Sequence, residues 1–595
     1  MNIKSIFLIL VLFYCNLFAQ ENITINVSSY VRTTLSNPKG YFKGWGVNLA
    51  GIGSRNYYNL VSQAKRDEWA QLFWKDCDMR HYRVSAGNGR DIQVIYSAVK
   101  LDSMYGQYMR DISKNQKNKV IKVFDPHGGW SYYDSLESWS PWFTDSLMRD
   151  YIIKNANVIK DFKDLYGYEM DYVEITNEPQ VFIDTTIPKT PPYYSWYNND
   201  NRKKAVTMVN MWREELDKRG LHNTKVIGPS KSGVFAGFDT LILKDFKEDS
   251  VGMYNLKGYS YHSYTSPLVK IVVDSLKNFD VDIWQTESGQ NPEQRGVANA
   301  ISDINLGTNF WQHYQAYSWS GNNDTTGESG VRYSSIIYPN TDSVRLYHYL
   351  RFYYFRELMK AIPYRSRVHL SSAYQSSWSS LSTTIRNRYI NMEPVGVEQP
   401  PVNATAVEAS DGHWNLIVFN PDSIPNKYNP YVPYKQTDFN VTFNIPELDC
   451  FGVQLFYARK ITKNKEELNF DTLTMNNGTI VISNVNDGDL VVLRSANVLT
   501  SNIYIKPIDT NKIEITNENI NLTFFNPSTQ TIRIRLVNTK GVTQKIIKTD
   551  TFNRGSYTIL LDGVYNFKGY YVVESINNYG HPKLIKMISS YIRQR

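Results

Sequence analysis

Residues 174–180 read EITNEPQ, and a short run of β-branched and aromatic residues that begins at Tyr172 leads into them. Because Tyr, Val, Ile and Thr favour extended backbone, the segment Tyr172–Asn177 is expected to be a strand. Pro179 fixes its own φ angle and pushes the preceding residue, Glu178, into an extended conformation. The pattern therefore predicts that the Glu178 carboxylate is held at the carboxyl end of a strand.

Other strand-like runs lie on both sides of this one, and helical stretches such as 146–165 separate them. Strands that alternate with helices favour parallel βα units, and eight such units over roughly 300 residues form a closed barrel. We therefore predict an α/β fold, a (β/α)8 TIM barrel over residues 40–364. The other seven expected strands are Gly44–Leu49, His81–Gly87, Val120–Asp125, Thr224–Gly228, Gly258–Tyr264, Asp282–Glu287 and Tyr314–Ser320.

The residues outside this region have a different pattern. Short alternating strands with turn residues between them predict a flanking antiparallel β-sandwich over 365–497. The segment 23–35, ITINVSSYVRTTL, alternates in the same way and is expected to join that sandwich as an N-terminal strand. Strands and turns continue over 498–595, which predicts a small C-terminal β-sandwich-like domain.

The first twenty residues, MNIKSIFLILVLFYCNLFAQ, place Lys4 before an apolar run and end near Ala19. This arrangement is typical of a secretory signal peptide, so residues 1–19 are expected to be removed and the protein to be secreted or at the cell surface. We find no later apolar run of about 18 residues, so no membrane span is expected. Cys77 and Cys450 would then be the remaining cysteines, too few for a disulfide framework.

The overall charge gives no indication of a nucleic-acid partner. The chain has 65 Lys and Arg against 57 Asp and Glu, a formal net charge of +8 over 595 residues. This bias is weak, and the basic residues do not form a concentrated patch in the sequence. Its 44 Tyr and 13 Trp, by contrast, supply flat rings with polar tips, which suit sugar-binding clefts as well as all-β domains.

A second glutamate, Glu287, ends the expected seventh strand, three βα units after Glu178. Both should lie at the carboxyl-terminal face of the barrel, where active sites of this fold form. Two carboxylates that flank one bond are the groups that hydrolyse a glycosidic linkage. A separation of about 5–5.5 Å gives retention of configuration and about 6.5–9.5 Å gives inversion, and the sequence by itself leaves this distance open.

With these residues, the chain resembles the clan A glycoside hydrolases over about 40–365, most specifically at NEP (177–179) and WQTE (284–287). The resemblance implies that Glu178 is the general acid/base, that Glu287 is the nucleophile, and that configuration is retained.

The resemblance also implies substrate-binding and supporting residues around this pair. Asn177 would hydrogen-bond the sugar 2-hydroxyl, and Arg83 would support the nucleophile. Either His262 or Tyr264 would orient the nucleophile, and Trp319 would form the floor of the central subsite. Three further residues of the expected rim complete the predicted substrate-binding set, namely His127, Trp130 and Trp284. The two histidines lack the third ligand that a metal site requires, so no metal and no cofactor are expected.

Within the clan, glycoside hydrolase family 30 is the most similar. The motif GWGVNLA (44–50) and an expected tyrosine-rich helix, RLYHYLRFYYFRELMKAI (345–362), support the likeness, whereas DPHGGWSYYD (125–134) departs from the family and leaves families 39 and 5 open. The segments TFFNPSTQTIRIRLVNTKG (523–541) and GYYVVESINN (569–578) resemble a type IX secretion sorting domain, which implies the secretion machinery as a partner.

The sequence thus predicts a secreted retaining β-glycosidase that acts on a carbohydrate substrate such as a β-linked galactan, glucan or xylan. The alternative is a catalytically silent carbohydrate-binding or adhesion protein that uses the same cleft. The polysaccharide and its linkage, endo or exo action, the oligomeric state and any cleavage of the C-terminal domain stay open at this level.

Overall fold

The computed structural model divides the chain into two compact units, Met1–Leu499 and Thr500–Arg595. The signal peptide predicted for residues 1–19 lies outside the residues whose structure is described. Within the described part of the chain, no helix has both the length and the apolar character that a membrane crossing requires. The described residues are 21–30, 34–48, 62, 64, 68, 71–85, 121–126, 145–167, 169–177, 199–231, 233–234, 236–263, 268–289, 293–319, 332–337, 345–372, 402–421, 423–424, 432–433, 438–469, 472–499, 512–516, 519–526, 530–538, 543–552, 555–561, 569–576 and 582–589.

Eight parallel strands close into a barrel in the first unit, in the order in which they occur along the chain. They are β2 (Gly44–Asn48), β3 (Met79–Ser85), β4 (Ile121–Asp125), β5 (Tyr172–Glu174), β6 (Lys225–Lys231), β7 (Leu256–His262), β8 (Asp282–Glu287) and β9 (Phe310–His313). The fold class predicted from the sequence, a (β/α)8 barrel with a flanking β domain, is confirmed.

Helices occupy the connections between these strands, as parallel neighbours require. They are the π-helical turn η2 (Gln71–Asp76), α5 (Asp145–Tyr166), α6 (Asn199–Lys218), α7 (Ala236–Glu248), α8 (Ser250–Asn255), α9 (Lys270–Leu276) and α10 (Glu293–Asn305), and α11 (Leu350–Ala361) follows the barrel. The expected helix at 146–165 is therefore present with one more residue at each end.

The strands bury both faces, as barrel strands do. On β7, Tyr259 and Tyr261 belong to the large core between strands and helices, and the intervening Ser260 is fully buried on the opposite, inner face. Inside the barrel, the rings of Trp284 and Phe310 stack 3.7 Å apart and pack with Tyr172. This aromatic layer fills the barrel below the strand ends, so the interior is a packed core.

Close packing and backbone conformation explain the two glycines of the GWG motif. A Cβ atom on Gly46 would lie 2.1 Å from Nδ1 of His81, so only glycine lets this imidazole cross the barrel interior beside β2. Gly44 has φ of +129°, a conformation that residues with a side chain rarely adopt.

The eighth strand is not where the sequence pattern placed it. β9 closes the barrel by pairing with β2 and β8, whereas the expected strand Tyr314–Ser320 corresponds to β10 (Gln315–Trp319). The earlier run is buried on both sides, because Phe310 fills the interior and Trp311 stacks on Phe355 of α11 at 5.0 Å. β10 instead belongs to a three-stranded sheet with β11 (Arg332–Ile337) and β12 (Arg345–His348).

The same small sheet shortens the tyrosine-rich helix expected at 345–362. Its first residues pair with β11 as strand β12, and the helix begins only at Leu350. The residues of Arg345–His348 pair antiparallel with Ser334–Ile337 of β11, so this segment forms a strand and not the first turn of the helix.

The flanking β domain is one ten-stranded sheet whose two ends meet, because β19 pairs with both β21 and β23. The segment β1 (Glu21–Tyr30) lies in its middle, antiparallel to β13 and parallel to β18, so the sheet is mixed where purely antiparallel pairing was expected. Its other strands are β13 (Arg367–Ser372), β14 (Asn403–Glu408), β15 (Trp414–Phe419), β18 (Phe439–Asn444), β19 (Val453–Ile461), β20 (Glu467–Asn469), β21 (Leu473–Asn476), β22 (Thr479–Val485) and β23 (Leu490–Ser495). A short pair, β16 (Ser423–Ile424) with β17 (Val432–Pro433), and the 3₁₀-helix η6 (Pro446–Phe451) complete this region.

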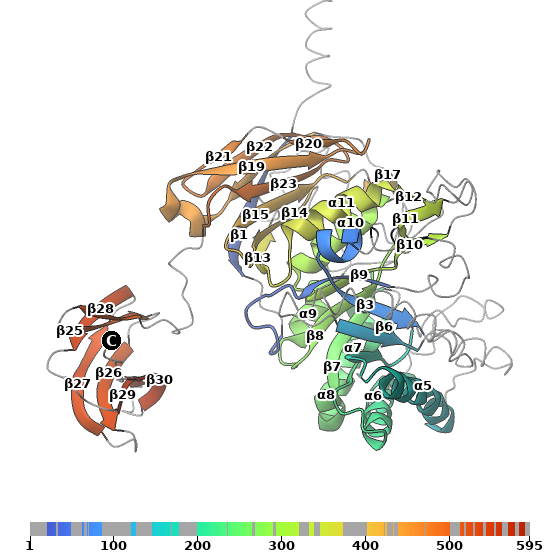
Figure 1. Cartoon of the computed structure of the whole chain (residues 1–595), viewed down its shortest axis with the longest axis horizontal. Helices are drawn as coiled ribbons and strands as arrows, with labels where there is room; N and C mark the ends of the chain where they lie inside the picture. The colour runs from blue at the N-terminus through green and yellow to red at the C-terminus, as the bar shows by residue number, and fades with distance from the viewer. Residues whose placement is uncertain are drawn as a thin grey trace, which may run out of the picture. The chain divides into compact units, whose positions relative to one another are not determined.

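Helices α10 and α11 join the barrel to this sheet (Figure 1). Asn403 of β14 donates to Oγ of Ser302 in α10 at 2.9 Å, and Asn415 of β15 donates to the Ala361 carbonyl of α11 at 2.6 Å. These buried amides tie the two substructures together within the first unit.

The second unit is built from strands that pair antiparallel in two sheets. One has the order β24-β25-β28 and the other β27-β26-β29-β30. Their bounds are β24 (Lys512–Thr516), β25 (Asn519–Asn526), β26 (Gln530–Asn538), β27 (Thr543–Phe552), β28 (Gly555–Leu561), β29 (Gly569–Ile576) and β30 (Pro582–Ser589).

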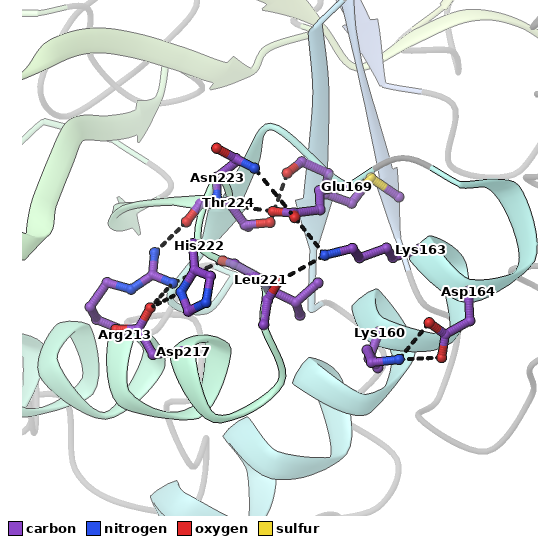
Figure 2. A network of polar contacts seen from close by, with 12 residues as sticks. Lys160, Lys163, Asp164, Glu169, Arg213, Asp217, Leu221, His222, Asn223 and Thr224 are labelled. Carbon is purple, nitrogen blue, oxygen red and sulfur yellow. Dashed lines mark hydrogen bonds and ion pairs between the residues drawn. The ribbon is translucent and has the colours of Figure 1, made fainter.

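A polar network, which we call the amino-end network, connects the loops that lead into β5 and β6 (Figure 2). Lys163 of α5 donates to Glu169 at 2.8 Å and to the Gly220 carbonyl at 2.7 Å. Arg213 of α6 donates to the carbonyls of Leu221 and Thr224. These contacts fix where both strands begin.

Candidate active site

Glu287, the expected nucleophile, is the last residue of β8 and is buried. β7 and β8 pair residue by residue from Gly258 to Tyr261, and the register then shifts so that His262 faces Glu287 and Thr286 is passed over. Such a bulge reverses the direction of the following side chain. Glu287 therefore points toward the same interior as Trp284, which simple alternation would not allow.

Arg83 of β3 is fully buried at the centre of this end of the barrel. Its Nη1 donates to Oε2 of Glu287. Its Nε and Nη2 both donate to Oε2 of Glu174, at 2.8 and 2.6 Å, and Nη2 also donates to Oδ1 of Asn177 at 2.6 Å. Nη2 lies 3.2 Å from Oδ2 of Asp125. We call these five residues the Arg83 cluster.

The cluster gathers three carboxyl groups, from the ends of three different strands, around one guanidinium. Burial lowers the pKa of Arg83, but Asp125, Glu174 and Glu287 raise it, and the net shift is well above the usual value. The guanidinium is therefore always charged, and its rigid fork of donors suits several carboxylate oxygens at once.

Glu174 is the carboxyl most affected by its surroundings. Complete burial raises its pKa, and Asp125 adds to that rise, while Arg83, His262 and the Thr286 hydroxyl act in the opposite direction; the net shift is upward. Desolvation disfavours a charged carboxylate, so this site favours the protonated acid relative to an exposed glutamate.

The structure brings together Arg83, Asn177, His262 and Glu287 of the residues predicted from the sequence. His262 is fully buried at the end of β7, and its Nε2 lies 4.0 Å from Oε2 of Glu287. Four more predicted residues, His127, Trp130, Glu178 and Tyr264, lie outside the described residues. The retention of configuration that the resemblance implies therefore stays a prediction.

The placement of Trp284 contradicts the substrate-binding position expected for it. Its side chain is fully buried in the aromatic layer, against Phe310 and Tyr172, and packs edge-on with His81 at 5.4 Å. It lies three residues before the strand end, one layer below Glu287, where no sugar can stack on it. The backbone of Trp319 lies in β10, which pairs with β11 and not within the barrel.

Sequence reasoning missed two members of the cluster, Asp125 and Glu174. Asp125 ends β4 as Glu287 ends β8, so the strand-end rule that selected Glu287 applied equally to it. Glu174 is a charged residue two positions after Tyr172, on the inward face of a strand otherwise made of apolar side chains. A carboxyl group in that position needs a buried partner. This requirement is the sequence signal that could have identified Glu174 as part of the site.

The described residues contain no group of three or more His, Cys, Asp and Glu side chains arranged to hold a metal ion. The carboxyl groups of the cluster instead bind a guanidinium. What the arrangement offers chemically is an oriented, buried carboxylate at the mouth of a barrel, with a permanent positive charge beside it.

No protein-family model matches the chain, and no curated protein matches it significantly. Solved structures that resemble it include glycoside hydrolases. The catalytic domain of a GH30 xylanase C from Talaromyces cellulolyticus has 12% identity and a TM-score of 0.49, covering 80% of this chain and 100% of its own. A GH30 endoxylanase from Clostridium papyrosolvens has 13% identity and a TM-score of 0.47, and the match covers 80% of this chain and 100% of that one.

A third similar structure is a β-porphyranase of glycoside hydrolase family 86 from Bacteroides plebeius. It has 11% identity and a TM-score of 0.44, and the match covers 96% of this chain and 100% of that one.

Proposed function

We propose that this protein is a retaining β-glycosidase that hydrolyses a β-linked polysaccharide or oligosaccharide. The observation that carries the proposal is the Glu287 carboxylate, buried at the carboxyl end of barrel strand β8 and bound by Arg83. Carboxyl ends of barrel strands are where this fold places its catalytic groups. A carboxylate whose orientation is fixed by a guanidinium is suited to attack an anomeric carbon.

In the proposed reaction, Glu178 protonates the glycosidic oxygen while a Glu287 oxygen forms a bond to the anomeric carbon and the leaving sugar departs. Glu178 then removes a proton from water, which attacks the same carbon and releases Glu287 as a carboxylate. Each step inverts the configuration, so the product retains it. Arg83 compensates the negative charge of Glu287 before the first step and after the second.

For the substrate we propose a β-linked galactan, glucan or xylan. The protein carries no concentrated positive charge in its sequence, so a neutral glycan suits it as well as an anionic one. Export out of the cell is part of the same proposal, because residues 1–19 have the pattern of a signal peptide. Finding those residues still attached in the protein recovered from its native host would contradict export by this route.

The experiment is a screen of purified protein for reducing-sugar release from about twenty glycans, followed by the Glu287→Gln variant on the best substrate. We expect the variant to lose about 1,000-fold or more in kcat, because the amide cannot form the glycosyl ester. Nuclear magnetic resonance of the first product gives its anomeric configuration. A variant that keeps wild-type turnover, or a first product of inverted configuration, would overturn the mechanism.

The alternative, a silent carbohydrate-binding protein, gives a different outcome in the same experiment. Affinity gels that contain each glycan measure binding without turnover. Retardation by a glycan that the wild-type protein never cleaves would favour binding alone.

A further inference from the structure

Glu174 makes contacts that differ from those of the other carboxyl groups around Arg83. It accepts two hydrogen bonds from the guanidinium, from Nε at 2.8 Å and from Nη2 at 2.6 Å, and both bonds reach the same oxygen, Oε2. Glu287 takes the other terminal nitrogen, Nη1. Because the guanidinium is planar and its donors have fixed directions, a group that holds the Nε edge also determines where Nη1 points.

We propose that Glu174 is a positioning residue for the reaction: it fixes the Nε edge of Arg83 so that Nη1 is aimed at Glu287 throughout the catalytic cycle. The proposal rests on the function proposed above. The positioning of Arg83 by Glu174 matters most in the glycosyl-enzyme intermediate, because Glu287 is then a neutral ester and no longer attracts Arg83. Glu174, with Asn177, then keeps the guanidinium in place for the second step.

The contact that Glu174 makes with Arg83 needs a single acceptor oxygen, because Oε2 accepts both hydrogen bonds from the guanidinium. A side-chain amide also presents one oxygen that can accept two hydrogen bonds. Burial raises the pKa of Glu174, so the site does not favour the charged form of this group.

This argument predicts an unusual order for two conservative substitutions. Glu174→Gln keeps the side-chain length and an oxygen that accepts both bonds from Arg83, but it removes the charge. Glu174→Asp keeps the carboxyl but withdraws it by one methylene from the guanidinium. If Glu174 acts by position, glutamine replaces it and aspartate does not; if its charge is what matters, the order reverses.

We expect Glu174→Gln to keep kcat within about 5-fold of wild type, and Glu174→Asp to lose about 100-fold in kcat with KM changed less than about 3-fold. Loss in kcat alone separates positioning from a general structural defect, which would lower the amount of folded enzyme without changing kcat per active site. Active sites are counted by the burst of the first product.

Glu357 of α11 supplies a matched control. It is a buried glutamate that pairs with Arg459 at 3.2 Å, on the side of the barrel that contacts the ten-stranded sheet. Glu357→Gln and Glu357→Asp should leave kcat within about 2-fold, because neither touches the Arg83 cluster. A Glu174→Asp variant that keeps kcat within about 3-fold, or a Glu174→Gln variant that loses as much kcat as Glu174→Asp, would overturn the proposal.

Crystal structures of the two Glu174 variants give a second measurement that does not require turnover. We expect the contact between Arg83 Nη1 and Glu287 to be kept in Glu174→Gln and lost in Glu174→Asp. A contact that is kept in both variants would refute positioning even if the wild-type protein hydrolysed no glycan. Absence of hydrolysis by the wild-type protein refutes the proposed function instead, so the two failures are distinguishable.

Discussion

The two ends of strand β5 present acidic residues in opposite surroundings. At the amino end, Glu169 accepts from Lys163 at 2.8 Å and from the backbone N–H of Asn223 at 2.9 Å (Figure 2). Burial tends to raise the pKa of Glu169, but these donors outweigh it and the pKa is lowered. Five residues later, burial prevails at Glu174 and raises its pKa.

The two ends differ in exposure to solvent and in how their charges are paired. The amino-end network is partly open to solvent, with 34% of the Lys163 side chain exposed, so its charges are hydrated and largely paired one to one. Three carboxyl groups share the single buried cation of the Arg83 cluster. Such an excess of acid is costly for folding and is typical of catalytic sites.

The largest difference in kcat between the two ends of β5 should appear when the same substitution, arginine to lysine, is made at Arg83 and at Arg213. Arg83→Lys keeps the positive charge but removes the fork that contacts Glu174, Asn177 and Glu287 together. We expect about 100-fold lower kcat, equivalent to about 2.7 kcal/mol, measured on the best glycan of the screen.

Arg213→Lys is the control at the other end. Arg213 contacts backbone carbonyls and Asp217, none of which belongs to the Arg83 cluster, so kcat should stay within about 2-fold of wild type. Equal losses in the two variants would mean that the two ends do not differ in role.

The pH dependence of stability should have opposite signs for the two glutamates. The folded pKa of Glu169 is lowered, so its ionised form stabilises the fold above its ordinary pKa of 4.5, and this contribution is lost as the pH falls. The folded pKa of Glu174 is raised, so its contribution is largest at low pH and declines as the pH rises above 4.5.

Urea midpoints between pH 4 and pH 8 test these signs, with each glutamine variant compared with wild type. Relative to wild type, Glu169→Gln should lose most stability at the upper end of this range, and Glu174→Gln should lose least there. Parallel midpoint curves for the two variants would contradict the assignment.

The smallest effect should come from Lys163→Met. This change removes the ion pair with Glu169 and the bond to the Gly220 carbonyl but keeps the apolar stem of the side chain. We expect a loss of about 0.5–1.5 kcal/mol in the free energy of unfolding and no change in kcat, measured by urea unfolding and by glycan hydrolysis. A decrease in kcat would link the amino-end network to the site.

Much of the barrel could be predicted from local pattern, and the exceptions share a cause. The strand Asp282–Glu287 has the bounds expected from its sequence, because its apolar residues and strand-end acid are local features. The eighth strand was misplaced by a few residues because Tyr314–Ser320 and Phe310–His313 are equally strand-like. The run Phe310–His313 is the one that closes the barrel, and it is buried by Phe355 on one face and by the aromatic layer on the other.

The class of fold and the position of Glu287 at a strand end follow from the amino-acid sequence, since hydrophobic alternation and strand punctuation are properties of neighbouring residues. Which side chains meet depends on how the strands are arranged in space. A register shift opposite Thr286 turns Glu287 inward, Trp284 becomes core, and Glu174 reaches Arg83, 91 residues away in the sequence. These outcomes depend on strand register and on desolvation, which no local pattern contains.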